Sequence, residues 1–410
     1  MHALTNSRSS ERGAMLVHVA IGMIAFMALC ALAVDFGVKW VGRTQAQAAA
    51  DAGALAGATA LAFDDPTPAD LSAAGVAKRS ARAYALSNWV WNLAPDVDIN
   101  TDITFPPCPP PNVGDTCVQV DVYRNQERAN PLPTFFARLV GVTEQGVKAT
   151  ATAMVLSGNS TTCMRPWAIP DRWSDNLDDP QDNQWTWDDK WERYFENGPN
   201  AGELMPGPVD EYVRPTDGPP PSPGSGFTLP DNLGDQVRLK AGNPAQSLTA
   251  GWFFPIDLPR LNEPDTGGDR YRDNIAGCNG LPVGIGDLIW NEPGDKIGPT
   301  RQGVNDLIAR DPNSYWDPGS ESVKCSTSSC PTPSPRIVPI PVFNPDAYSQ
   351  QDKTSGKFQI EITNILGFYI ERMQGNDVIG YFLTYPGDFN PDNDAVPEEA
   401  AFLKQIILVR

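Results

Sequence analysis

The chain has 410 residues, of which 41% are hydrophobic and 20% charged, so it is long enough for two or three domains with buried cores. Its formal net charge of −19 argues against the clustered basic surface that binds phosphates, so we expect no nucleic-acid partner. The 40 prolines are about twice the usual share of ~5% and predict many turns and loops.

The first predicted element is an apolar segment at residues 13–34, which contains no charged residue. As a helix rising ~1.5 Å per residue, it is long enough to cross the ~30 Å hydrocarbon core of a bilayer. We therefore predict a transmembrane helix that follows a cytoplasmic tail at residues 1–12. A cleaved signal peptide is the alternative, although its apolar region is ordinarily only ~7–15 residues long.

The orientation of this segment depends on the cysteines. Cations flank it on both sides, with Arg8 and Arg12 before it and Lys39 and Arg43 after it, so the positive-inside rule does not decide. Six of the seven cysteines follow the segment, and none of them forms a C-x-x-C metal knuckle. Disulfides in an oxidising compartment are favoured over six reduced thiols, which places the C-terminal region outside the cytoplasm.

Six cysteines allow 15 pairings, so sequence spacing favours a pattern without fixing it. Cys108 with Cys117 and Cys325 with Cys330 are close pairs that bracket short loops, which leaves Cys163 with Cys278.

Helical character continues beyond the apolar segment. Residues 35–61 contain no proline and are rich in alanine, the best helix former, so one helix is expected from about residue 13 to about residue 62. Ala49, Gly53 and Gly57 recur every four residues and form a row that lets another helix approach closely. The row packs either against the next helix of this chain or against a neighbouring subunit, which would give helix-mediated self-association.

Three parts of this region resemble the N-terminal region of Tad-type Flp pilus-assembly proteins of the TadG-like and TadE-like kind. They are residues 12–14 (RGA), residues 33–35 (AVD) and residues 49–57 (AADAGALAG), in which Gly stands at one position where the family usually has Ala. Residues 133–142 (PTFFARLVGV) and 149–153 (ATATA) resemble a later part of such proteins.

The resemblance implies a single-pass protein of the bacterial cytoplasmic (inner) membrane. Its C-terminal domain would be periplasmic or extracellular, and its partners would be membrane lipid and pilus or secretion-system proteins. Some relatives are cleaved like prepilins, with a Glu five residues after the Gly at the cleavage site. If Gly13 were that Gly, His18 would stand in place of the Glu, so processing is left open.

The predicted fold class is α+β, with a small α+β unit at residues 35–156 and a β-rich, loop-rich domain at residues 157–410. In the first, we expect a helix at 68–86, strands at 97–105, 117–123 and 147–156, and a short helix at 132–140. In the second, we expect a Pro/Gly-rich loop at 215–226 and strands at 336–343, 358–363, 365–373, 378–385 and 402–409, a succession that suits a meander.

Two features of the second domain have alternative interpretations. Five tryptophans alternate with aspartates between residues 167 and 191, which indicates either aromatic loops packed on a β core or a carbohydrate platform. Asp388, Asn390, Asp392, Asp394 and Glu399 occupy positions one, three, five, seven and twelve of a calcium loop. Since Asn393 replaces the turn glycine, a solvated acidic loop is favoured over a Ca²⁺ site, and no other cofactor is expected.

The residues for common catalytic sites are missing. His2 and His18 are the two histidines, so the outer domain has neither a Ser-His-Asp or Cys-His arrangement nor His-ligated zinc. We expect no enzyme and predict a structural or assembly component of a Tad-like pilus system. A surface adhesion or ligand-binding module on a membrane stalk is the alternative, and an exported carboxylate-dependent hydrolase is third.

Overall fold

The computed structural model describes residues 8–64, 70–109, 116–176, 185–195, 198–215, 224–258, 267–353 and 356–409. Residues 1–7 of the expected tail and residues 216–223 of the expected Pro/Gly-rich loop lie outside the described residues. The chain divides into two compact units, which are treated separately below. Unit 1 consists of Met1–Leu61, Asp70–Met154 and Ile406–Arg410, and unit 2 of Ala62–Ala69 and Val155–Gln405.

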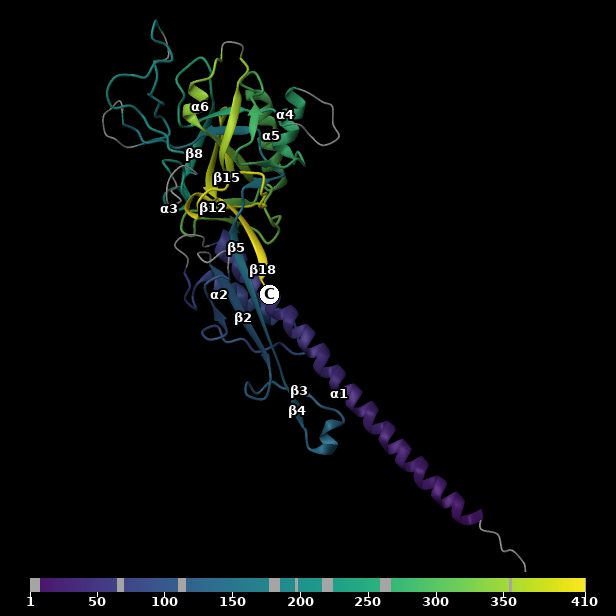
Figure 1. Ribbon diagram of the computed structural model, residues 1–410. Helices are drawn as coiled ribbons and strands as arrows, with labels where there is room; N and C mark the ends of the chain where they lie inside the picture. Colours follow the sequence, from purple (N-terminus) through teal and green to yellow (C-terminus); the bar gives the residue numbers. More distant parts are fainter. Residues whose placement is uncertain are drawn as a thin grey trace, which may run out of the picture. The chain divides into compact units, whose positions relative to one another are not determined.

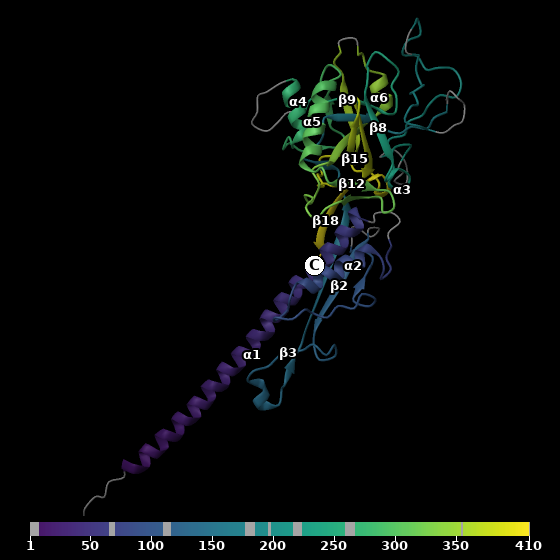
Figure 2. The ribbon, with the colours of Figure 1, turned by 180° about the vertical axis from the view of Figure 1, so that it is seen from behind.

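Helix α1 (Arg8–Phe63) is a single helix of 56 residues. At ~1.5 Å per residue it is about 84 Å long. Figures 1 and 2 show it as one continuous rod, which agrees with the absence of proline from its sequence. The predicted long N-terminal helix is confirmed, and so is the α+β fold class, because several sheets follow it.

An antiparallel pair of long strands forms the main ladder of the sheet in unit 1. Strands β2 (Cys117–Arg124) and β5 (Val147–Ser157) are antiparallel, with Cys117 opposite Met154 and Arg124 opposite Val147. Their alternating sequence buries one face, as expected for a strand with one side against a core. The short strand β1 (Ile103–Thr104) extends the ladder beside β2, and helix α2 (Val76–Ser87) belongs to the same unit.

Three local predictions in unit 1 are wrong in extent or type. The helix expected from residue 68 begins at Val76, and the strand expected at 97–105 is reduced to two residues. The Asp98 carboxylate accepts the N–H groups of Asn100 and Thr101, so a turn replaces the start of that strand. The helix expected at 132–140 is instead strand β3 (Leu132–Pro133) followed by the 3₁₀ helix η1 (Ala137–Val140), and β3 pairs with β4 (Glu144–Gln145).

Six strands of unit 2 pair in a closed ring. Strand β15 pairs with β14, β14 with β7, β7 with β9, β9 with β8, β8 with β16, and β16 again with β15. The β14–β7 and β8–β9 pairs are parallel, and the other four are antiparallel. Their bounds are β7 Trp167–Pro170, β8 Gln236–Ala241, β9 Trp252–Pro255, β14 Ile337–Phe343, β15 Gln359–Gln374 and β16 Asp377–Leu383.

The ring contains the expected meander, because β14, β15 and β16 are consecutive antiparallel neighbours. Two strands expected at 358–363 and 365–373 are one strand of 16 residues, β15. Its first residues pair with β11 (Leu288–Trp290) and its later residues with β16, so one long strand has different partners along the same edge.

Helices α4 (Gly268–Ala276) and α5 (Ile297–Arg310) pack closely together in unit 2, as both ribbon views show (Figures 1 and 2). A Cβ added at Gly303 would lie 2.7 Å from the Ile275 Cβ, so the close approach requires a glycine there. The remaining elements of this unit are β6 Ser160–Thr161, α3 Leu229–Asn232, β10 Val283–Gly284, β12 Ser314–Asp317, β13 Ser322–Cys325, α6 Pro345–Ser349, β17 Tyr385–Pro386 and η2 Glu398–Ala400. Strand β18 (Leu403–Val409) begins in unit 2, and its residues from Ile406 onward belong to unit 1.

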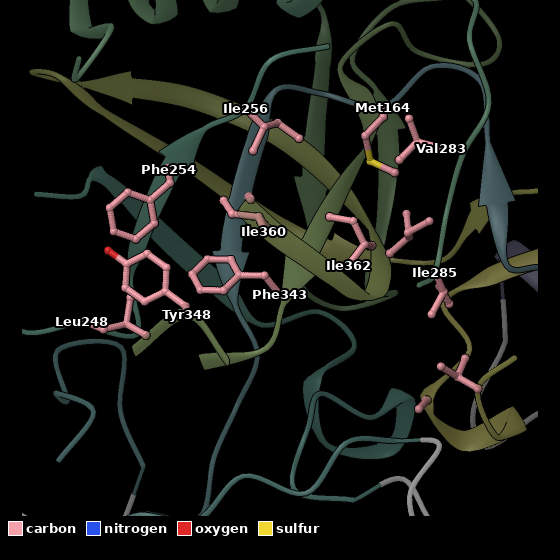
Figure 3. Packing of buried hydrophobic residues seen from close by; sticks show 14 of the residues in the cluster. Met164, Leu248, Phe254, Ile256, Val283, Ile285, Phe343, Tyr348, Ile360 and Ile362 are labelled. Atoms are coloured by element: carbon pink, nitrogen blue, oxygen red, sulfur yellow. The ribbon is translucent and has the colours of Figure 1, made fainter. Parts of the chain in front are cut away.

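Aromatic and branched aliphatic side chains fill the core of unit 2. Figure 3 shows Phe254, Phe343 and Tyr348 meeting from β9, β14 and α6, with the Phe254 and Tyr348 rings stacked 5.0 Å apart. Burial of such side chains gives roughly 1.5–3 kcal/mol each, which makes this core the main stabilising feature of the unit.

Candidate functional site

The first half of α1 presents a long apolar surface that is exposed in the described part of the chain. Every residue from 15 to 34 is exposed except Ala31, which is half-buried. The large side chains are open to their surroundings, with Leu16 72%, Phe26 68% and Leu32 68% exposed. Within the described part of the chain, α1 is the one helix long and apolar enough to cross a membrane.

Asp35 ends this apolar surface and makes an unusual set of bonds. Its carboxylate is buried and accepts the backbone N–H groups of Phe135 (2.7 Å), Phe136 (3.0 Å) and Ala137. Hydrogen bonds to an ionised acceptor are roughly twice as strong as those between neutral groups. One carboxylate therefore fixes a loop from 100 residues further along the chain to the helix.

We call residues 134–143 the exit loop, because they are bound at the point where the apolar surface of α1 ends. The Thr134 hydroxyl closes the loop, 2.9 Å from the Val142 carbonyl oxygen and 2.8 Å from that of Thr143. Gly141 has a φ of +87°, a left-handed conformation that favours glycine, and ends η1 within the loop.

The strands on either side of the exit loop also contact α1. Leu132 is buried against Gly42, where an added Cβ would lie 2.6 Å from the Leu132 Cδ1. The Gln145 amide donates to the backbone carbonyls of Asp35 (3.3 Å) and Pro133 (3.1 Å). The loop is thus held to the helix through residues 135–137 and through the residues that flank both of its ends.

The small-residue row of α1 packs inside the chain. A Cβ on Gly53 would lie 3.0 Å from the Ala81 carbonyl oxygen and 3.0 Å from the Ala85 Cβ, both on α2. A Cβ on Gly57 would lie 2.8 Å from Val118 on β2, and Ala49 in the same row is fully buried. Of the two alternatives, packing against the next helix of this chain is the one seen in unit 1.

The similarity to known proteins also lies in this part of α1. Residues 13–60 match the model of the Tad family, described as Flp pilus-assembly TadE/G-like. The chain carries a TadE/G-like domain. Neither a curated protein nor a solved structure matches the chain significantly, so the similarity concerns this domain.

The Tad domain thus contains the apolar surface, Asp35 and the small-residue row, all on one helix. Sequence patterns identified its residues but not the bond between Asp35 and the exit loop, because the two partners are 100 residues apart. The available signal was indirect: an acidic residue directly after an apolar segment, where neither lipid nor an apolar core provides a partner for it.

The six cysteines after the apolar segment form three disulfides. Cys108 is bonded to Cys117, Cys163 to Cys278, and Cys325 to Cys330, which is the pairing that the spacing favoured. Cys30 is free and exposed on the apolar part of α1. Disulfides of this kind persist in oxidising compartments.

The five residues of the acidic loop have different surroundings. Asp394 forms an ion pair with Arg214 (2.6 Å), and the backbone N–H of Asn390 donates to the Asn159 side chain (2.7 Å). Asp388 and Asp392 are exposed, as is Glu399 in η2. No group of three or more His, Cys, Asp or Glu side chains in the described residues is arranged to hold a metal ion, and calcium binding stays a hypothesis.

The five tryptophans between residues 167 and 191 lie in the core of unit 2 or pack against it. Trp173 is buried and makes edge-to-face contacts with Trp191 at 5.6 Å and with Trp185 at 6.0 Å. Trp187 stacks on Phe227 at 5.6 Å. Rings that bury each other in this way favour the core interpretation over an exposed carbohydrate platform.

A buried carboxylate, Asp171, joins three parts of unit 2. It accepts hydrogen bonds from the Tyr212 hydroxyl (2.8 Å) and from the backbone N–H groups of Phe227 (2.9 Å) and Arg172 (2.9 Å). Burial raises its pKa to about 6, because removal from water disfavours the charged form more than these donors favour it. Sequence patterns did not single out this residue among the many acidic ones.

Unit 2 also has an open groove of about 1350 Å³. Aromatic side chains, including Trp191, Tyr194 and Phe254, line it together with the carboxylates Glu292 and Asp352. Its lining therefore combines aromatic rings with carboxylates.

Proposed function

We propose that this chain is a membrane-anchored, non-enzymatic component of a Tad-like (Flp) pilus assembly or a related secretion system. The observation that carries the proposal is the coincidence of two features on α1. The TadE/G-like domain at residues 13–60 begins with an apolar surface that has the length of a bilayer core.

The cytoplasmic (inner) membrane of a bacterium is the proposed location, with residues 1–12 inside and the C-terminal domain in the periplasm or outside the cell. The uncharged sequence at residues 13–34 supports the span. The three disulfides support the orientation, because their cysteines would remain reduced in the cytoplasm.

The proposed role is to hold unit 2 outside the membrane for contact with pilus or secretion-system proteins. The sequence supports a structural role, because the common catalytic arrangements need a histidine and both histidines, His2 and His18, precede the outer domain. Its acidic character and net charge of −19 argue for a solvated protein that contacts other proteins rather than nucleic acid.

Gene deletion in the bacterial host tests the proposal. We expect loss of surface pili by electron microscopy and recovery when the full chain is supplied from a plasmid. The matched control replaces residues 1–34 with a cleavable signal peptide, which exports the same outer part without its anchor, and we expect no recovery. Normal pili in the deletion strain, or full recovery with the unanchored protein, would contradict the proposal.

A surface ligand-binding module is the second candidate, and the groove of unit 2 favours it. Under this alternative, deletion would leave pilus number unchanged and reduce attachment to a glycan or host surface. Tyr194→Ala, in the groove wall, would reproduce that loss, while Tyr84→Ala on α2 in unit 1 would not. Loss of pili together with attachment would instead favour the assembly role.

A further inference from the structure

The exit loop exposes large apolar side chains of its own. Phe135 is 54% exposed, Phe136 44% and Val142 48%, although their backbone is held firmly by Asp35 and Thr134. Exposed apolar groups clustered on a fixed loop usually mark an interaction surface.

The position of the loop identifies the surface that it meets. Asp35, its main anchor, is the first residue after the exposed apolar surface of residues 15–34. The loop therefore lies at the level where α1 would leave a bilayer. Phe36 and Trp40 are also exposed there, on the helix itself, at 63% and 66%. Aromatic side chains at both ends of a span are typical of the lipid–water interface.

The charges around the loop fit the same surface. Arg138 on the loop and Lys39 and Arg43 on α1 are exposed cations next to the aromatic groups. Cations at this level can interact with lipid phosphates, while their aliphatic stems contact the apolar region below. Glu144, in β4 at the end of the loop, is an exposed carboxylate among them.

We propose that the exit loop is a second lipid contact, in which Phe135, Phe136 and Val142 enter the outer interface of the bilayer that α1 spans. This inference rests on the proposed membrane anchoring. Lipid is the occupant because Asp35 binds the backbone of the loop at the residue where the exposed apolar surface of α1 ends, which places the exposed side chains of the loop beside that surface. A lipid contact beside the helix, joined to it by one carboxylate, restricts the depth and the rotation of α1 more than the interfacial side chains of the helix do alone.

Depth-dependent fluorescence quenching tests the proposal on the full chain in phosphatidylcholine–phosphatidylglycerol vesicles. In a Cys30→Ala background, Val142→Cys carries an environment-sensitive fluorophore, and the quencher is a lipid with a nitroxide near the top of its acyl chain. Tyr84→Cys is the matched control: it is exposed on α2, whose neighbour Ala85 packs against Gly53. Gly53 is 18 residues beyond Asp35, about 27 Å along the helix.

We expect strong loss of fluorescence at position 142 and none at position 84. The same fluorophore on the native Cys30, within the apolar surface and five residues before Asp35, reports the anchoring itself. Quenching at Cys30 without quenching at position 142 overturns the loop contact and leaves the anchoring intact, and a protein partner would then be the occupant. No quenching at Cys30 overturns the proposed anchoring and, with it, this inference.

A second variant tests the role of Asp35. Asp35→Asn keeps the size of the side chain but replaces one acceptor oxygen with an NH₂ group, which cannot accept the N–H groups of the loop. We expect quenching at position 142 to fall and quenching at Cys30 to stay unchanged. Equal quenching at position 142 with and without the D35N change would overturn the pinning role of this carboxylate.

Discussion

Removal of the Cys163–Cys278 disulfide should destabilise unit 2 far more than removal of Cys325–Cys330. The first bond joins residues 115 positions apart, and the second joins residues 5 positions apart. If a disulfide acts mainly by restricting the unfolded chain, the loop lengths give losses of about 5 kcal/mol for the long loop and about 2 kcal/mol for the short one.

Equilibrium unfolding in urea, with the full chain in detergent micelles, measures both losses. Each disulfide is removed by changing both of its cysteines to alanine. Tryptophan fluorescence reports on unit 2, where Trp167, Trp173 and Trp191 are buried. Equal losses for the two variants, at unchanged dependence on urea concentration, would refute the reasoning from loop length.

Two further changes test the packing of α1 and the buried carboxylate. Gly57→Ala should lower the free energy of unfolding by about 1–3 kcal/mol, because its Cβ would lie 2.8 Å from a Val118 methyl group. Gly37→Ala, with open space around it, should be neutral or stabilise by up to ~1 kcal/mol. Urea unfolding of both proteins measures these effects, and equal effects would contradict the prediction. Between pH 4 and pH 6, unit 2 should lose about 3 kcal/mol as pH rises, because folded Asp171, with its pKa raised to about 6, keeps a proton that the unfolded chain releases near 3.8. Asp171→Asn should remove that dependence, and an unchanged pH profile in unfolding experiments would argue against it.

Local patterns predicted the features that depend on local sequence. The proline-free, alanine-rich stretch predicted α1, and the alternation in residues 117–123 predicted β2. The short loops between neighbouring cysteines favoured the disulfide pairing that the structure contains. In each case the physical cause lies within a few residues of the element itself.

Long-range contacts decided the rest. The sequence at 132–140 has helical character, but Asp35 binds three of its backbone N–H groups and Thr134 closes the loop, so a hairpin tip with one 3₁₀ turn forms instead. Closure of the six-strand ring requires β7, β8 and β9 to join the meander, and their short sequences do not specify which strands they pair with.

The central claim is that residues 13–34 hold the chain in a membrane with its C-terminal part outside the cytoplasm. Two separate assays on the full chain with a C-terminal tag test this claim: carbonate extraction of the membranes, and protease treatment of intact spheroplasts. We expect a protein that stays in the membrane fraction and loses its tag to external protease. A protein released by carbonate, or a tag protected until the cells are lysed, would contradict the account.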